Sequence, residues 1–414
     1  MRRLVLSTRI DSNKLATSLA TWGLFILFPG FMIYHTLLAM GVIPAFIAGL
    51  FGPVSAIYFI LFLALLPFTY KKNLSACPMY YVSVLLFFAY CIIWMIFHYF
   101  IIQEPYVKMA SIQSVATLIK WSALFFIGMH FSFEKTAVLN LVTGFFIIVF
   151  WGLMYFTIVT GNVIFIASRF FNLPNDVAVA SYQGFSRSAL VVAVLLLCLQ
   201  KSFYRRILTA MAGLFVLFIL SARSELYGFL FFCAVYFSVL SLRNVKWFII
   251  CVCIGLAAAF FISASIDRLS KSRQLEIVDF EESSSWTERQ NLQRIALQQI
   301  AENPVFGLFG GHIDATGSKG GYSHNALSAW LNYGLLGFLL YLGLTIIATF
   351  HSALYFFKYG PLSTRWTLAF AINSICFLLV IVSKSVFWSL PALGWGLYIN
   401  AAVYQKRLRS EVAP

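Results

Sequence analysis

A histidine and an asparagine stand side by side where a long apolar stretch begins. His324 and Asn325 are followed by the segment ALSAWLNYGLLG. A neutral imidazole has a pKa near the working pH and can remove a proton from a hydroxyl group. The neighbouring amide can hydrogen-bond a sugar hydroxyl. The structural alternative is that the two residues only cap the helix that follows.

Several cationic side chains stand beside apolar segments, where an unpaired charge is costly. Arg223 interrupts the apolar stretch around LSARSELYG, and Arg187, in YQGFSRSAL, begins another. Arg289 begins a predicted loop helix, where its charge opposes the helix dipole. Lys384 stands between the last two apolar segments. Guanidinium groups match phosphate oxygens in paired hydrogen bonds, so these residues are candidate anion contacts, although Glu225 could instead pair locally with Arg223.

These residue types together favour one class of chemistry. Several arginines and one histidine at a membrane surface would suit a lipid-linked diphosphate with a sugar acceptor. The diphosphate is a good leaving group, and arginines would stabilise the charge that develops on it. The histidine would deprotonate the acceptor hydroxyl. We expect no metal ion and no other cofactor, because the first predicted outer loop, AMGVIPAFIAGLFGP, carries no acidic residue to hold a divalent cation.

The composition predicts that an all-α membrane protein positions these residues. Of the 414 residues, 61% are hydrophobic and only 10% are charged, whereas a soluble domain carries about 25% charged residues. A spanning helix needs ~20 apolar residues, because the hydrocarbon is ~30 Å thick and each residue rises ~1.5 Å. About twelve stretches qualify: 17–38, 48–69, 79–102, 110–131, 138–160, 186–200, 207–222, 224–241, 247–265, 324–352, 365–383 and 386–404.

The basic residues predict the orientation of these spans. Most of them fall in alternate gaps, which the positive-inside rule assigns to the cytoplasm, together with both termini. The chain then divides into an N-terminal bundle of about nine spans, 1–265, an outer loop, 266–323, and a C-terminal bundle of about three spans, 324–414. Because the chain leads straight into a full-length span, we expect no cleaved signal peptide.

The outer loop, 266–323, has internal order of its own. Ser285–Glu288 fits a capping box, and apolar residues then recur at helical spacing, which predicts an amphipathic helix of about 16 residues. Asn303-Pro304 ends that helix, and a glycine-rich stretch able to wrap around a ligand follows it. A long loop of this kind is usually functional or disordered, and its order favours function. The candidate ligand contacts in the glycine-rich stretch are Gly310, Gly311 and His312.

Two other readings of the composition are set aside. The net charge of +15 follows mostly from the topology, so we expect no nucleic-acid partner. All seven cysteines lie in or beside predicted spans, so we expect buried thiols, without a disulfide framework or a zinc site.

Two segments resemble the signature of the O-antigen ligase and polymerase superfamily: ERQNLQRIALQQIAENPVFGLFGG and YSHNALSAWLNYGLLGFLLYL. The signature has an arginine before a loop helix, an Asn-Pro end, an apolar-Gly turn, a His-Asn pair and a Gly-x-x-Gly in the following span. The upstream LSARSELYG looks like the family's serine-arginine segment. In this chain the elements are Arg223, Arg289, Asn303-Pro304, Gly307, His324-Asn325 and Gly334–Gly337.

The resemblance implies a GT-C-like polytopic glycosyltransferase of the bacterial inner membrane, with its active site in the periplasm. The donor would be an undecaprenyl-diphosphate-linked glycan, and the acceptor of a ligase would be the sugar of lipid A–core. The transfer would be of the inverting type. By carry-over, His324 is the candidate base and Arg223 and Arg289 are the candidate diphosphate clamps. Asn325, Arg187 and Lys384 are further candidate substrate contacts.

Two alternatives remain open beside the ligase. A polymerase of O-antigen or exopolysaccharide would use the same chemistry with a second lipid-linked repeat unit as acceptor. A transporter or flippase of an anionic lipid-linked sugar would also account for about twelve spans with both ends inside. Against the transporter, the chain shows no two-fold internal repeat and no matched pair of broken spans in its two halves.

Overall fold

The described part of the chain is built from helices alone. The computed structural model describes residues 12–44, 49–102, 104–134, 136–161, 165, 182–242, 284–360 and 363–412, and these ranges contain no strand. The helices are α1 (Ser12–Leu27), α2 (Pro29–Ala39), α3 (Phe51–Ala76), α4 (Pro78–Ile101), α5 (Pro105–His130), α6 (Thr136–Thr160), α8 (Tyr182–Leu199), α9 (Phe203–Ile219), α10 (Arg223–Ser241), α13 (Ser284–Glu302), α14 (Gly311–Thr316), α15 (Leu327–Tyr359), α16 (Thr364–Val382) and α17 (Leu390–Val412).

The predicted polytopic, all-helical membrane architecture is confirmed. Among the described residues, nine helices are long and apolar enough to cross a bilayer. Each predicted span in the described ranges falls on helix, the first of them on α1 and α2 together, while the predicted span 247–265 lies outside the described residues. Two helices that carry predicted spans are not among the nine. The helix α9 has only 17 residues, and α17 carries Asn400 and a basic last turn. The count of about twelve spans therefore stays a prediction.

The outer surface of the bundle is suited to lipid. Large apolar side chains on α3, α4 and α6 are exposed, among them Phe68, Phe100 and Ile148, which are exposed by 68%, 71% and 72%. Apolar patches of this extent are rare on soluble monomers. By contrast, α17 is buried over most of its first half, and a helix enclosed by other helices can carry a polar residue such as Asn400.

The centre of the bundle is the contact between α5 and α17. Gly128 of α5 and Gly396 of α17 let the two backbones touch, because a Cβ atom at either position would collide with the facing backbone. Small residues permit such close approach between membrane helices. Trp121 of α5, Tyr341 of α15 and Trp395 of α17 are fully buried beside this contact.

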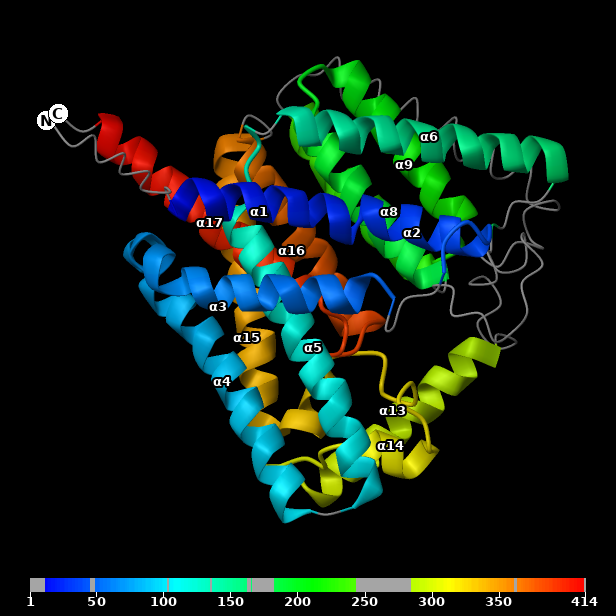
Figure 1. Cartoon of the computed structure of the whole chain (residues 1–414), viewed down its shortest axis with the longest axis vertical. Helices are drawn as coiled ribbons and strands as arrows, with labels where there is room; N and C mark the ends of the chain where they lie inside the picture. Colours follow the sequence, from blue (N-terminus) through cyan, green and yellow to red (C-terminus); the bar gives the residue numbers. More distant parts are fainter. Residues whose placement is uncertain are drawn as a thin grey trace, which may run out of the picture.

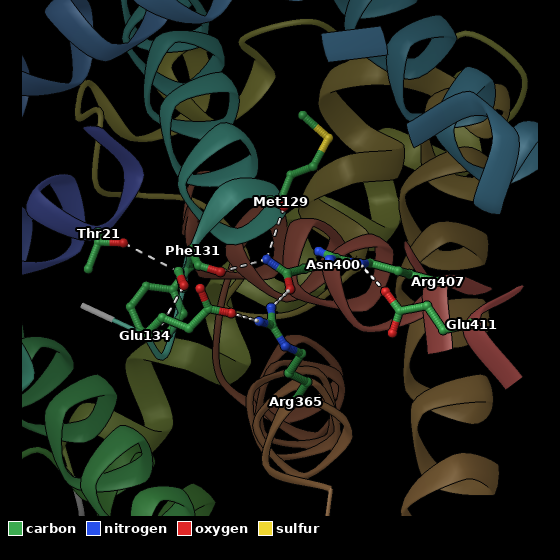
Figure 2. Close-up of polar contacts among 9 residues, drawn as sticks. Thr21, Met129, Phe131, Glu134, Arg365, Asn400, Arg407 and Glu411 are labelled. Carbon is green, nitrogen blue, oxygen red and sulfur yellow. Dashed lines mark hydrogen bonds and ion pairs between the residues drawn. The ribbon is translucent and has the colours of Figure 1, made fainter. Parts of the chain in front are cut away.

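A polar network closes one end of the α5–α17 contact (Figure 2). The Asn400 side-chain amide donates to the carbonyl oxygens of Met129 and Phe131, at 3.0 and 2.8 Å, where the end of α5 leaves carbonyls unpaired. The Arg365 guanidinium of α16 donates to Asn400 Oδ1 at 2.7 Å and lies 3.8 Å from a Glu134 carboxylate oxygen. Three helices, α5, α16 and α17, are thereby joined, and α5 is the helix that carries Lys120 into the site described below.

A break in α15 receives the loop that follows α13. Gly334 is non-helical, with φ 67° and ψ −179°, and interrupts the ladder of backbone hydrogen bonds. The loop supplies the missing partners: Leu308 N donates to Leu331 O at 2.8 Å, and Leu335 N donates to Val305 O at 2.9 Å. A Cβ atom at Gly334 would lie 2.8 Å from Val305 O, so the break requires glycine here.

Figure 1 shows where the loop between α13 and α14 lies in the molecule. The helices α13 and α14 lie together at the end of the molecule opposite the C-terminal end of α17. Through its backbone hydrogen bonds, this loop fixes the predicted outer segment to α15, the helix that begins just after His324.

Candidate functional site

One cavity of about 760 Å³ is enclosed by several separate segments. Its walls come from the middle of α5, the start of α8, the corner between α9 and α10, the start of α13, the segment before α15, the end of α16 and the α16–α17 linker. Ligand pockets of drug-sized molecules run to about 300–1,000 Å³, so a diphosphate and a sugar unit would fit.

The structure brings five of the predicted residues to this cavity. They come from α8, α10, α13, the segment before α15 and the α16–α17 linker, which are far apart in the sequence. The five are Arg187, Arg223, Arg289, His324 and Lys384.

His324 is held neutral by its surroundings. Partial burial lowers the pKa of its imidazole to about 4, and the positive charges of Arg289 and Lys384 act in the same direction. The ring centroids of His324 and Tyr322 are 5.2 Å apart. This pKa lies below the value near the working pH that was expected from the sequence. The imidazole is therefore unprotonated at neutral pH, the form that a general base requires, but it is a weaker base than an ordinary histidine.

Arg223 is aimed into the cavity by a sharp corner between α9 and α10. Ser221 has φ 62°, and it is the one non-glycine residue with positive φ among the residues that the structure describes. Such a conformation costs about 1–3 kcal/mol and tends to occur at functional sites. The corner is held by Ser186 Oγ, which donates to Leu220 O at 3.2 Å. Arg223 is then the first residue of α10.

Arg289 reaches the cavity from α13, but from a different place on the helix than the sequence predicted. The helix begins at Ser284, so Arg289 lies in its second turn. The helix dipole acts mainly within the first turn, which removes the argument that this cation opposes it. Trp286 and Glu288 of the same helix also line the cavity. The predicted capping box begins at Ser285, one residue inside α13.

Arg187 lies on an aromatic surface. Its guanidinium carbon is 4.2 Å from the ring centroid of Phe51 and 5.6 Å from that of Phe31. Stacking of this kind holds the planar group while leaving its edge available to an anion. Its Nε atom is buried and has no hydrogen-bond partner in the described part of the chain.

Lys384 and Glu225 form a buried ion pair at the cavity wall. Lys384 Nζ lies 2.6 Å from Glu225 Oε1, and the two side chains are exposed by only 11% and 1%. Ser224 Oγ donates to the other carboxylate oxygen at 2.7 Å. The sequence had left open a local pairing of Glu225 with Arg223, whereas the ion pair described here joins it to a residue 159 positions later.

The remaining predicted contacts do not line the cavity. Asn325 serves the chain itself: its Oδ1 accepts hydrogen bonds from Ser323 Oγ at 2.7 Å and from Leu327 N at 3.1 Å. The second bond is a local turn that orders the chain just before α15, whose N-cap residue is Ala326. The predicted contact of Asn325 with a ligand stays a prediction. His312 is buried behind the cavity, with Nε2 3.3 Å from Gln113 Oε1.

Gly310 and Gly311 lie at the start of α14, away from the cavity lining. Gly310 has φ 77°, and a Cβ atom there would meet Ala110 of α5. Gly310 therefore permits close packing of the start of α14 against α5, while a Cβ atom at Gly311 would meet Leu308 and Gln299. Their predicted contact with a ligand stays a prediction.

From the sequence, no role was assigned to several cavity residues. Lys120 lies in the middle of α5, where the positive charge of Arg187 repels its own; its signal in the sequence was a single lysine within an apolar span. Aromatic and hydroxyl groups had no such signal, because these types are common throughout the chain. They are Tyr182, Tyr227, Trp286, Tyr322, Phe387 and Trp388, with Ser221, Ser224, Ser383, Ser385 and Ser389.

The described residues give the cavity an excess of positive charge. Among them, five cationic side chains line it, against two carboxylates: Glu288 on the wall and Glu225 behind Lys384. At an effective dielectric constant of 20, two charges 4 Å apart interact by about 4 kcal/mol, so this excess favours a ligand with two or three negative charges. Within the described residues, no group of three His, Cys, Asp or Glu side chains could hold a metal ion.

The neutral state of His324 predicts an unusual pH profile. If His324 is the base, kcat/KM requires its unprotonated form, so activity is lost as pH falls through the pKa. With a pKa of about 4, kcat/KM is expected to stay level from about pH 8 down to about pH 5 and to halve near pH 4. A profile measured with samples returned to neutral pH as inactivation controls would test this. Half-maximal kcat/KM near the ordinary histidine value of about 6.5 would contradict it.

Comparison of the sequence with known proteins does not assign the chain to a family. None of the protein-family models matches the chain, and no curated protein is similar enough to match it. The resemblance to the O-antigen ligase and polymerase superfamily therefore rests on the segments that contain Arg223, Arg289 and His324.

Proposed function

We propose that this protein is an O-antigen ligase-type glycosyltransferase. It transfers a glycan from undecaprenyl diphosphate to an acceptor sugar, that of lipid A–core, without a metal ion. The observation that supports the proposal is the convergence of five cationic side chains and one neutral imidazole in one cavity. The protein would lie in the bacterial inner membrane, with both termini in the cytoplasm and the cavity open to the periplasm.

The proposed reaction assigns a role to each group. His324 takes the proton of the acceptor hydroxyl, and the acceptor oxygen forms a bond to the anomeric carbon of the donor. The bond from that carbon to the diphosphate breaks, and undecaprenyl diphosphate leaves with the electron pair. Arg223 and Arg289 bind the diphosphate oxygens, where they stabilise the charge that develops on departure. Arg187 and Lys384 extend the same positive surface.

Purified protein in nanodiscs tests this proposal. An undecaprenyl-diphosphate-linked glycan is supplied with lipid A–core, with and without a chelator, and the products are separated by gel and mass spectrometry. We expect the glycan on lipid A–core in both conditions. Loss of product with the chelator would contradict the metal-free mechanism.

Two other products would identify the alternatives. Joined repeat units on one undecaprenyl diphosphate, without modified lipid A–core, would assign the protein as a polymerase. If no glycosidic bond forms, but the protein moves the labelled donor across the bilayer of sealed proteoliposomes, the protein is a transporter and the proposed function is wrong.

A further inference from the structure

The buried carboxylate behind the cavity has no role in the proposed reaction, and burying a charge without a function is costly. Glu225 is only 1% exposed and does not line the cavity itself. The Lys384 ammonium forms an ion pair with one of its oxygens at 2.6 Å, and the Ser224 hydroxyl donates a hydrogen bond to the other at 2.7 Å. Replacing such pairs by apolar residues is often neutral or stabilising, so stability does not account for this one.

The ammonium that Glu225 holds shares the cavity with other cations. Lys384 shares the cavity with Lys120, Arg187, Arg223 and Arg289. A lysine side chain is a flexible four-carbon stem with a point charge, so repulsion by these neighbours would turn it away from the cavity. The Glu225 carboxylate supplies the attraction that keeps it there.

The backbone beneath Lys384 is also fixed. The N–H groups of Ser383 and Lys384 both donate to Leu379 O at 2.7 Å, which ends α16. Lys384 Nζ lies 5.6 Å from the ring centroid of Trp388, a residue of the same linker. The stem therefore begins at a fixed point, and Glu225 fixes its far end.

We propose that Glu225 is a positioning residue that holds the Lys384 ammonium at the cavity wall, where it contacts the diphosphate of the donor. The proposal rests on the proposed function for the identity of the ligand. Glu225 belongs to the first turn of α10, beside Arg223, so the ion pair also joins the α16–α17 linker to the helix that carries another diphosphate contact. Glu225 itself touches no substrate and acts through Lys384.

Binding of inorganic pyrophosphate to the purified protein tests this inference without any catalysis. Calorimetry would give its Kd for the unmodified protein, Glu225→Gln, Lys384→Met and the double variant. We expect each single variant to weaken binding about tenfold and the double variant to weaken it by no more than Lys384→Met, because both changes remove one contact. Glu225→Asp, which keeps the charge, is expected to restore most of the affinity.

Matched controls separate this inference from folding and from the proposed function. Glu302→Gln removes an exposed carboxylate of α13 outside the cavity and should leave the Kd unchanged, and the thermal midpoint of each variant reports folding. An unchanged Kd for Glu225→Gln or for Lys384→Met, effects that multiply to about a hundredfold in the double variant, or no rescue by Glu225→Asp would overturn the inference. Glycan transfer is assayed separately, so a protein that binds pyrophosphate as expected but transfers no glycan refutes only the proposed function.

Discussion

Replacement of His324 by alanine is expected to lower the rate of glycan transfer by about 10²–10⁴-fold, the contribution of a positioned general base. The imidazole is neutral at working pH because burial and the cations beside it lower its pKa, and no other histidine lines the cavity among the residues described. The variant should bind pyrophosphate as tightly as the unmodified protein or more tightly, because the cationic side chains remain. Transfer is measured with purified protein, donor and acceptor.

His351→Ala is the matched control for that experiment. His351 is an exposed residue of α15 whose Nδ1 lies 2.9 Å from the Tyr398 hydroxyl, and it does not line the cavity. We expect it to transfer glycan at nearly the unmodified rate. Transfer by a well-folded His324→Ala protein within a few-fold of the control would exclude the imidazole as the base.

Replacement of Arg289 by alanine is expected to lower kcat/KM for the donor by about 10²–10³-fold, the usual loss on removing one donor from a developing oxyanion. The guanidinium lies on the cavity wall, where a diphosphate would accept two hydrogen bonds from it. Arg289→Lys keeps the charge but loses the paired geometry, so its defect should be smaller. Pyrophosphate binding should weaken in the same order.

Arg294→Ala controls for the charge and helicity of α13. Arg294 is an exposed residue of the same helix and does not line the cavity. It should retain donor kcat/KM, and equal losses in Arg289→Ala and Arg294→Ala would show that general basic charge on α13, rather than contact with the ligand, accounts for the effect.

The secondary structure was predictable from the sequence because lipid imposes a simple rule. Backbone polar groups in hydrocarbon have to be satisfied within the segment, so ~20 apolar residues predict a helix. Each predicted span within the described ranges lies on a helix for this reason. The ends of helices were less predictable: α13 begins at Ser284, and terminal turns depend on weak local interactions.

The break in α15 could not be predicted from the sequence, although the two glycines at the break were noted there. Gly307 and Gly334 stood out only as parts of a resemblance. In the structure both have positive φ, and the loop between α13 and α14 pairs with the backbone on both sides of Gly334. Whether a glycine breaks a membrane helix depends on such partners from a distant segment, which local sequence does not contain.

For individual polar residues too, the sequence predicted some positions and left others to the tertiary structure. Arg187, Arg223, Arg289, His324 and Lys384 were singled out because charge near lipid is costly, and all five line one cavity. Asn325 was equally prominent in the sequence, yet its side-chain oxygen accepts hydrogen bonds from its own segment, just before the next helix. The same amide can serve either purpose, and only the direction in which it points decides between them.

The sequence by itself determined that the chain forms apolar helices and that a few cations lie where topology does not require them, since hydropathy and charge are properties of the residues. The tertiary structure alone decided that these cations meet, that Lys120 joins them, and that Glu225 pairs with Lys384 instead of serving only its neighbours. Those facts depend on how helices distant in the chain pack, and packing is a property of pairs of surfaces that no single segment encodes.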